Sequence, residues 1–456
     1  MSTEIKPAEN KMGTMPIGKL LFTMSAPMVA SMMFQALYNI VDSVFVARLG
    51  QDALNAVSLA FPLQMLCMSF GVGTGVGVNA LLSRSLGQKD QKKADETANS
   101  HILITVLMGI FFAILGIFVA RPFFVFQTNN TNIINYGSNY ILVVMGCSIF
   151  LFSQICMERL LQSTGKTNLA MIPQLIGAII NMCLDPVFIF GLFGAPRLEV
   201  KGAAVATIFG QTIATIIGFT LNKKYNHEIH LKLSEVLKFH GSTIKDIFKI
   251  GFPSIVMQCI GSFMNLGINK ILISFTEAAT AVFGAYYKIQ SFIFLPVFGL
   301  NNATVPIISF NYGARKPERY KKTLKLAIIS AVGIMTIGTI LFETIPQVLL
   351  GLFKPSAEML LVGKSAFRII GLHFPLAGFC IVAVSVCQAL EKPQYSLITS
   401  ICRQLVVLLP AAYLLSKLGN VSYVWFAFVL AEFVSLILSF IFLNKTLKAA
   451  AKRFHD

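Results

Sequence analysis

Charged side chains are scarce in this sequence of 456 residues. Asp, Glu, Lys and Arg make up 12% of it, whereas apolar residues make up 55%. Soluble globular chains average roughly 25% charged residues, so this composition excludes a soluble fold of this size. Apolar runs recur from one end to the other, and a helix needs about 20 such residues to cross a bilayer. We therefore expect an all-α integral membrane protein.

Acidic residues are the rarer of the charged residues, with 20 Asp and Glu against 37 Lys and Arg. The net charge of +17 does not indicate nucleic-acid binding, because the basic residues form short clusters between apolar runs. If the N-terminus is cytoplasmic, cytoplasmic segments carry 26 Lys and Arg and the opposite segments carry 8. The positive-inside rule then predicts that both termini are cytoplasmic.

Patterns typical of enzymes and metalloproteins are also missing. The eight cysteines lie in apolar runs without a CxxC pair, so we expect buried free thiols. No Ser/His/Asp or Cys/His set stands out, and we expect no catalytic residue, cofactor or metal site. The glycine run from Gly71 to Gly77 lacks a following Lys-Ser/Thr, which favours close helix packing over phosphate binding. His227 and His230 are interpreted as parts of a solvated loop.

Twelve apolar runs predict twelve transmembrane helices in two six-helix lobes. A cytoplasmic leader (1–18) precedes the N-lobe (19–222), and no secretory signal is apparent in it. A polar loop (223–245) leads to the C-lobe (246–444) and a cytoplasmic tail (445–456). The predicted spans are 20–47, 53–82, 98–120, 137–157, 168–194, 201–221, 246–274, 279–306, 324–345, 365–388, 396–416 and 422–443.

The two halves repeat one another in a register of 226 residues. This shift aligns prolines, amides, glycines and a lysine, in the pairs Pro27/Pro253, Asn39/Asn265, Gln64/Gln290, Gly73/Gly299, Gly87/Gly313, Gln162/Gln388 and Lys166/Lys392. Each half has an even number of spans, so the halves insert with the same orientation and form pseudo-symmetric lobes. A cavity between two such lobes is sufficient for transport, and we expect a monomer.

Polar residues inside the spans gather on a few helix faces. Gln35, Tyr38, Asn39 and Asp42 have the spacing of one face of the first span. Carboxylates at membrane depth are costly and are functional candidates. The alternative is that Asp42 lies at the outer interface and pairs with Arg48.

A second polar face lies in the fifth and sixth spans. Asn181 and Asp185 are one turn apart, as are Ala203 and Thr207. Together with Asp42 they supply hard oxygen donors that suit Na⁺, and two nearby carboxylates would equally share a proton. The alternative is that Asp185 caps a broken helix or pairs with a basic residue.

The C-lobe has its own membrane acid, Glu432, which is a secondary candidate for coupling. Pairing with Lys288 or Arg403 would instead give it a structural role, which we favour. Glu158 lies at the inner end of the fourth span, and we expect a surface ion pair between it and Arg159.

Several motifs resemble the multidrug and toxic compound extrusion (MATE) family over most of the chain. They are Ala26-Pro27, Tyr38-Asn39-Ile40-Val41-Asp42, Leu49-Gly50, Ser83-Arg84-Ser85-Leu86-Gly87, Asn181-Met182-Cys183-Leu184-Asp185-Pro186, Gly202-Ala203-Ala204-Val205-Ala206-Thr207, Phe252-Pro253 and Asn311-Tyr312-Gly313. The chain looks closest to the bacterial MepA-like and DinF-like branch. The resemblance implies a bacterial plasma (inner) membrane protein that exports lipophilic, often cationic small molecules in exchange for Na⁺ or H⁺.

The resemblance also implies roles for individual residues. Asp42, Asn181, Asp185, Thr207 and the Ala203 carbonyl match the family's cation site in the N-lobe. The substrate pocket maps to Gln35, Tyr38, Asn39 and Tyr140, and Pro27 maps to the helix bend. Gly261 and the region around His373 stand where the NorM-like branch has C-lobe acids, which argues against a cation site there. The alternatives are a lipid-linked precursor flippase, or a narrow-substrate metabolite exporter, of the same superfamily.

Overall fold

The structure is a computed structural model that describes residues 10–353 and 355–453. Residues 1–9 of the predicted leader, Lys354 and residues 454–456 of the predicted tail lie outside the described part. The described residues form helices and connecting segments and contain no strand. The all-α fold class expected from the sequence is confirmed.

The N-terminal lobe contains six spans, the fourth of which is broken. Its elements are α1 (Lys11–Thr14), α2 (Ile17–Ala47), α3 (Gln51–Gly87), α4 (Gln91–Gln127), α5 (Thr131–Gly146), α6 (Ser148–Ser163), α7 (Thr167–Phe190), a 3₁₀ turn (Leu192–Gly194) and α8 (Val200–Tyr225). The short helix α9 (Leu233–Val236) lies in the connection to the second lobe.

The C-terminal lobe repeats this plan, and its tenth span is broken in the corresponding place. Its elements are α10 (Gly241–Ile273), α11 (Glu277–Gly313), α12 (Pro317–Thr344), α13 (Pro346–Gly351), α14 (Ala357–Gly371), α15 (Phe374–Ala389), α16 (Pro393–Ile401), a π-helical turn (Cys402–Leu408), α17 (Leu409–Ser416) and α18 (Val421–Lys452). By length and composition, ten helices of the described chain can cross a membrane, and the bent pairs α5–α6 and α14–α15 bring the spans to twelve.

Several helices extend beyond the predicted spans. Helix α2 begins at Ile17, inside the predicted leader, and α18 continues to Lys452, inside the predicted tail. Helices α8 and α10 shorten the predicted loop from both sides. Hydropathy marks the part of a helix that meets lipid, whereas the polar last turns of the same helix remain hydrogen-bonded beyond it.

At each break the two helices of the span meet at a bend of 46°, and neither bend was predicted. In the C-lobe, Pro375 supplies no N–H to the carbonyl of Gly371 four residues earlier. The Thr339 hydroxyl donates to that carbonyl instead, at 2.8 Å. In the N-lobe the break falls at Cys147, between Gly146 and Ser148, without a proline nearby.

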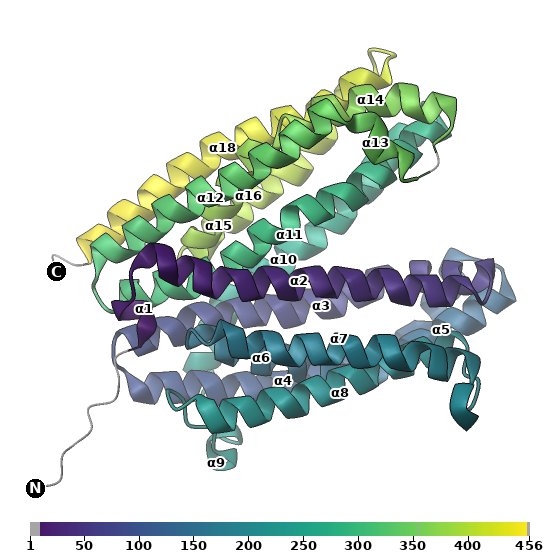
Figure 1. Ribbon diagram of the computed structural model, residues 1–456. Helices are drawn as coiled ribbons and strands as arrows, with labels where there is room; N and C mark the ends of the chain where they lie inside the picture. Colours follow the sequence, from purple (N-terminus) through teal and green to yellow (C-terminus); the bar gives the residue numbers. More distant parts are fainter. Residues whose placement is uncertain (1–9, 354, 454–456) are drawn as a thin grey trace, which may run out of the picture.

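The lobes lie side by side, and both termini emerge at the same end of the molecule (Figure 1). Near that end the helices of the two lobes approach one another, and they diverge toward the opposite end (Figure 1). Helix α2 packs against α7 of its own lobe and α11 of the other, while α10 packs against α3 and α16. The first helix of each lobe therefore lies between the two lobes.

Contacts between the lobes obey the repeat of the sequence. A Cβ added at Gly73 would lie 2.3 Å from Ile255, and one at Gly299 would lie 2.6 Å from Val29. A shift of 226 residues turns the first contact into the second. The prediction of two pseudo-symmetric lobes is therefore confirmed. The glycine run of α3 packs against α6 and α10, as expected, because Gly71 meets Ile155 and Gly77 meets the Ile247 carbonyl.

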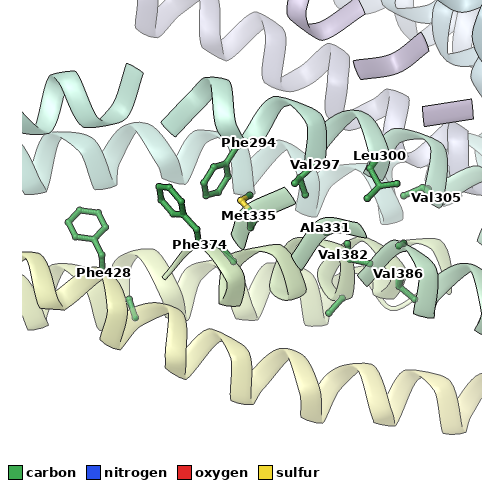
Figure 2. Close-up of a cluster of buried hydrophobic side chains, with 14 of the residues drawn as sticks. Phe294, Val297, Leu300, Val305, Ala331, Met335, Phe374, Val382, Val386 and Phe428 are labelled. Carbon is green, nitrogen blue, oxygen red and sulfur yellow. The ribbon is translucent and has the colours of Figure 1, made fainter. Parts of the chain in front are cut away.

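Apolar side chains fill the interior of each lobe and also cover its lipid-facing surface. Figure 2 shows part of the C-lobe core, where Phe294 and Val297 of α11 meet Met335 of α12 and Phe374 of α15. The rings of Phe294 and Phe374 pack edge to face with centroids 5.5 Å apart. Such a core fixes the helices from which polar side chains project.

Candidate functional site

The polar face predicted for the first span belongs to α2, where that helix packs against α7. The Gln35 side-chain oxygen accepts a hydrogen bond from Gln174 of α7 at 3.3 Å, and Tyr38 and Asp42 are half-buried. Asn39 is exposed and lies outside the contact between Gln35 and Gln174. The α2 stripe therefore divides into a buried part and an exposed Asn39.

Asp42 does not form the ion pair with Arg48 that was considered as an alternative. The Arg48 guanidinium lies over the Phe45 ring, 5.6 Å from its centroid. The Asp42 Oδ1 atom is buried without a hydrogen-bond donor among the described residues. Asp42 lies on the helix that packs against α7, which holds Asp185.

Asn181, Asp185 and Thr207 come together between α7 and α8. The Asn181 amide nitrogen donates to the Thr207 hydroxyl at 3.1 Å, and that hydroxyl donates to the Ala203 carbonyl at 3.0 Å. Asp185 is 0% exposed and Asn181 is 3% exposed. Within the described chain, the Asn181 side-chain oxygen and both carboxylate oxygens of Asp185 have no hydrogen-bond donor.

Glycines allow this arrangement by letting α7 and α8 approach closely. A Cβ at Gly210 would lie 2.6 Å from the Gly177 carbonyl oxygen, and one at Gly202 would lie 2.4 Å from the Phe188 carbonyl oxygen. Any larger residue would separate the helices and lengthen the hydrogen bond between Asn181 and Thr207. The acid–amide–hydroxyl cluster therefore depends on small residues that carry no chemistry themselves.

Three glutamines extend this cluster and were not predicted as site residues. Gln64 of α3 donates to the Tyr140 hydroxyl at 2.7 Å, and Tyr140 is buried. Gln174 bonds to Gln35, and the Gln211 side-chain oxygen is buried without a donor among the described residues. Gln64 was noted only as a member of the repeat. A search for amides inside apolar spans would have found all three.

Comparison of the sequence with known protein families identifies the family of this chain. The sequence model of MatE matches residues 27–187 and again 253–414, together more than half of the chain. The chain belongs to the MatE family. The starts of the two matches, Pro27 and Pro253, are separated by the repeat of 226 residues. Because MatE proteins are transporters, this chain is a multi-pass membrane transporter and not an enzyme.

Relatives of this MatE protein include the FAD transporter of Shewanella oneidensis, 28% identical over 408 residues that cover 89% of this chain and 90% of the relative. The multidrug export protein MepA of Staphylococcus haemolyticus is 25% identical over 424 residues, or 93% of this chain and 92% of MepA. Among solved structures, an outward-facing multidrug resistance MATE transporter of the MOP superfamily aligns with a TM-score of 0.91 at 25% identity. That alignment covers 98% of this chain and all of the solved one.

The C-lobe of this MatE protein contains a different polar pair. Glu432 of α18 is 4% exposed, and its carboxylate oxygens lie 3.4 and 3.5 Å from one guanidinium nitrogen of Arg403. Arg403 projects from the π-helical turn Cys402–Leu408. Of the two predicted partners, Lys288 is not the one: its ammonium group lies over Phe353, 5.8 Å from the ring centroid.

The prediction about Glu158 and Arg159 is wrong. Glu158 and Arg159 do not pair at the surface, and both are buried. Neighbouring residues of a helix point about 100° apart, so Glu158 accepts from Gln154 at 2.9 Å while Arg159 donates to Gln162 at 2.9 Å and to Asn302 of the other lobe at 3.3 Å.

The cysteines are all free, but only four of the eight are buried as expected. Three are half-buried, and Cys183 of α7 is exposed. It lies between Asn181 and Asp185 in the sequence, and their inward direction turns Cys183 outward. In the loop, His230 lies 3.0 Å from Asp95 and both predicted histidines are accessible. No three His, Cys, Asp or Glu side chains of the described chain could together hold a metal ion.

Proposed function

We propose that this MatE protein is a secondary active multidrug antiporter. It exports lipophilic, often cationic small molecules across the bacterial plasma membrane in exchange for Na⁺ or H⁺, by alternating access of one cleft to the two sides. Its termini are cytoplasmic, as the distribution of Lys and Arg indicates. The family and the relatives named multidrug export proteins support the export of drugs.

The observation that carries this proposal is the set of buried oxygens without donors in the N-lobe. Asp42, Asn181 and Asp185 contribute four such oxygens. A buried carboxylate without a partner is costly, and a bound cation or a proton removes that cost. The Ala203 carbonyl and Thr207 hydroxyl add further oxygen donors beside them. Hard oxygen donors suit Na⁺, and two close carboxylates are equally suited to share a proton.

Coupling follows if the occupant of these oxygens changes between the two sides of the membrane. A cation or proton that binds one conformation better than the other shifts the population toward that conformation. Gln35, Tyr38, Asn39 and Tyr140 supply neutral hydrogen-bonding groups and ring faces for an organic cargo. Pro27 removes one backbone hydrogen bond inside α2, so α2 can bend when the occupant changes.

A second candidate is a narrow-substrate metabolite exporter. The relative named FAD transporter, 28% identical over most of both chains, favours it. The flippase alternative has less support, because Arg403 already pairs with Glu432 and Lys288 lies against Phe353. Few cations inside the spans therefore remain for a lipid-linked phosphate.

Purified protein in liposomes distinguishes these candidates. Ethidium and FAD are loaded separately, and Na⁺ and pH gradients are imposed one at a time. We expect ethidium movement that requires one of the two gradients and is lost in Asp42→Asn. Asp52→Asn is the matched control, because Asp52 accepts hydrogen bonds from Asn130 and Asn132 at the exposed start of α3, away from the cluster.

Each outcome has a distinct meaning. FAD movement without ethidium movement favours the metabolite exporter. Ethidium movement that is equal in wild type and Asp42→Asn, at matched incorporation, would refute Asp42 as a coupling residue. Movement of either compound at the same rate with and without an imposed Na⁺ or pH gradient would refute coupling to these ions.

A further inference from the structure

The lobes of this protein meet at the end that carries the termini through a symmetric crossing of α3 and α11. A Cβ at Gly87 would lie 2.0 Å from the Phe310 carbonyl oxygen, and one at Gly313 would lie 2.2 Å from the Arg84 carbonyl oxygen. The shift of 226 residues exchanges these two contacts. They join uncharged backbone surfaces, which can separate without breaking an ion pair.

Two ion pairs join the lobes near this end. One, at 3.3 Å, is between Lys93 of α4 and Asp246 of α10. The other crosses the junction of α3 and α11 and has no counterpart in the repeat. Glu391, in the turn between α15 and α16 of the C-lobe, pairs with Arg84 of α3 in the N-lobe. It also accepts from Arg453, beyond α18 of its own lobe, at 2.9 Å. The residues that correspond to Arg84 and Glu391 in the opposite halves are Phe310 and Gly165, which carry no charge.

The turn that holds Glu391 has the geometry of a glycine turn. In the N-lobe, the Gly165 N–H donates to the Gln162 carbonyl and the Lys166 N–H donates to the Leu161 carbonyl. In the C-lobe, Glu391 and Lys392 make the same two bonds, to Gln388 and Cys387. Gly165 has φ +84° and Glu391 has φ +63°. Only glycine enters this left-handed region without strain, so the turn itself does not explain a glutamate.

The charged and aromatic groups around Glu391 explain why a glutamate stands at this position. The Arg84 guanidinium lies over the Tyr312 ring, 5.7 Å from its centroid, and Arg453 donates to the Tyr312 hydroxyl at 3.1 Å. Two guanidinium groups thus converge on one tyrosine and one carboxylate. Without the carboxylate they would repel one another across the junction. The side chains of Arg84 and Glu391 are mostly buried, 22% and 27% exposed, so water screens the attraction between them only in part.

We propose that Glu391 is a positioning residue for the transport cycle, which holds the lobes together at the terminal end by binding Arg84 and Arg453, and that this contact must break when that end opens. This inference rests on the proposed alternating access. The contact favours the conformation described here over one that opens at the terminal end, because only the former brings Arg84 to Glu391. We call the contact of Glu391 with Arg84 and Arg453 the latch. The backbone strain of a glutamate at a glycine position is then the cost of this latch between the lobes.

The test measures the distance between the lobes in the full-length protein. Spin labels replace Lys92 of α4 and Lys321 of α12, which are exposed and lie in different lobes near the terminal end. The labels are attached through an unnatural ketone amino acid, because the eight native cysteines are free. Electron–electron double resonance in lipid nanodiscs gives the distance distribution without requiring a transported substrate.

Glu391→Gln should increase the longer-distance population at least threefold. The matched control is Glu318→Gln, which removes the same charge from an exposed position on α12 that forms no ion pair in the described chain. It should leave the distribution unchanged. Arg84→Gln should give the same longer distances as Glu391→Gln, because it removes the partner across the junction while the pair of Glu391 with Arg453 inside the C-lobe remains.

Glu391→Gly removes the carboxylate of the latch but suits the left-handed backbone of the turn, so it tests the two features separately. Glycine relieves the backbone strain and so offsets part of the loss of the two ion pairs. This variant should therefore fold, and it should show the same longer distances as Glu391→Gln. If Glu391→Gln fails to fold, Glu391→Gly carries the test alone. Unchanged distances in both variants would overturn the proposal. A shift in distance without any ethidium or FAD movement would support the latch while counting against the proposed cargo.

Discussion

At the scale of a single residue, Thr207 links the two helices of the N-lobe cluster. Thr207→Val keeps the shape but leaves the Asn181 amide nitrogen without its acceptor. A buried donor that loses its partner costs about 1–3 kcal/mol. We expect a lower melting temperature and weaker stabilisation by added Na⁺ or by protons, measured by thermal unfolding in detergent.

Two controls accompany that measurement. Thr207→Ser retains the hydroxyl and should behave like wild type. Thr220→Val makes the same change on α8 at an exposed position, where the hydroxyl bonds only to the Ile216 carbonyl of its own helix. Equal melting temperatures for Thr207→Val and Thr220→Val would contradict a role for the Asn181–Thr207 bond.

Glu432 allows a separation of structural and coupling roles. Glu432→Gln leaves the half-buried Arg403, 28% exposed, without its counter-ion. Loss of one partner costs about 3–5 kcal/mol for a fully buried pair, and partial solvation of Arg403 makes the cost here smaller. The double variant Glu432→Leu with Arg403→Met removes both charges, so we expect it to recover most of the lost stability. Thermal unfolding and transport are measured on both variants.

The two measurements decide between the roles. Recovered stability with normal transport supports the structural role that the sequence favoured. Recovered stability with lost transport would assign Glu432 to coupling.

At this scale the sequence identified the polar residues of the candidate site, but it did not show how closely the helices that carry them pack. Asp42, Asn181, Asp185 and Thr207 could be selected because acids, amides and hydroxyls are unusual inside apolar runs and because their spacing places them on helix faces. Gln174 and Gln211 have the same signal and also share helix faces with the cluster, since Gln174 precedes Asn181 by seven residues and Gln211 follows Thr207 by four. Gln64 lies on α3, apart from these faces. The close approach of Gly177 to Gly210 depends on the relative position of two helices, which no spacing within one helix reveals.

At the scale of the elements, glycines determine how closely the helices of different lobes approach. Gly77→Ala would place a Cβ 2.3 Å from the Ile247 carbonyl oxygen of α10. Backbone atoms cannot yield locally, so α3 and α10 must separate, and overpacking of this kind costs about 1–3 kcal/mol. We expect a lower melting temperature and a longer distance between the lobes.

Gly284→Ala provides the control for that change. Gly284 lies in α11, and a Cβ there would meet no atom within 4 Å. Alanine favours the helix over glycine by about 1 kcal/mol, so this variant should be as stable as wild type or slightly more stable. A melting temperature that falls equally in both variants would show that general loss of glycine, and not contact with α10, is responsible.

The ends and breaks of helices were less predictable than their existence. Twelve apolar runs were readable because each is long enough to cross lipid. The break before Pro375 has a signal in the sequence, since proline withholds an N–H from the carbonyl of Gly371. The break at Cys147 has no such signal, and its position became clear only from the structure. Polar turns beyond the lipid, such as those of α18, also escape hydropathy.

At the scale of the whole molecule, the lobes should assemble without a covalent link. The contacts of α10 with α3 and of α11 with α2 and α3 join them directly. The connecting segment is held by the N-lobe, because His230 bonds through its backbone to Asp95 and Asn99. A chain divided after Lys238 would therefore lose one connection and retain every contact between the lobes.

Co-expression of residues 1–238 and 239–456, with an affinity tag on one fragment, tests this expectation. Both fragments should purify together in detergent and retain at least half of the transport of the intact chain. A division at residue 365, inside α14, cuts a helix of the C-lobe core and should abolish assembly. Because each half is a complete repeat with an even number of spans, each can insert with its own topology and bury its own core before the lobes meet. Fragments that separate under mild detergent would instead mean that the covalent connection, and not the paired glycine crossings, keeps the lobes together.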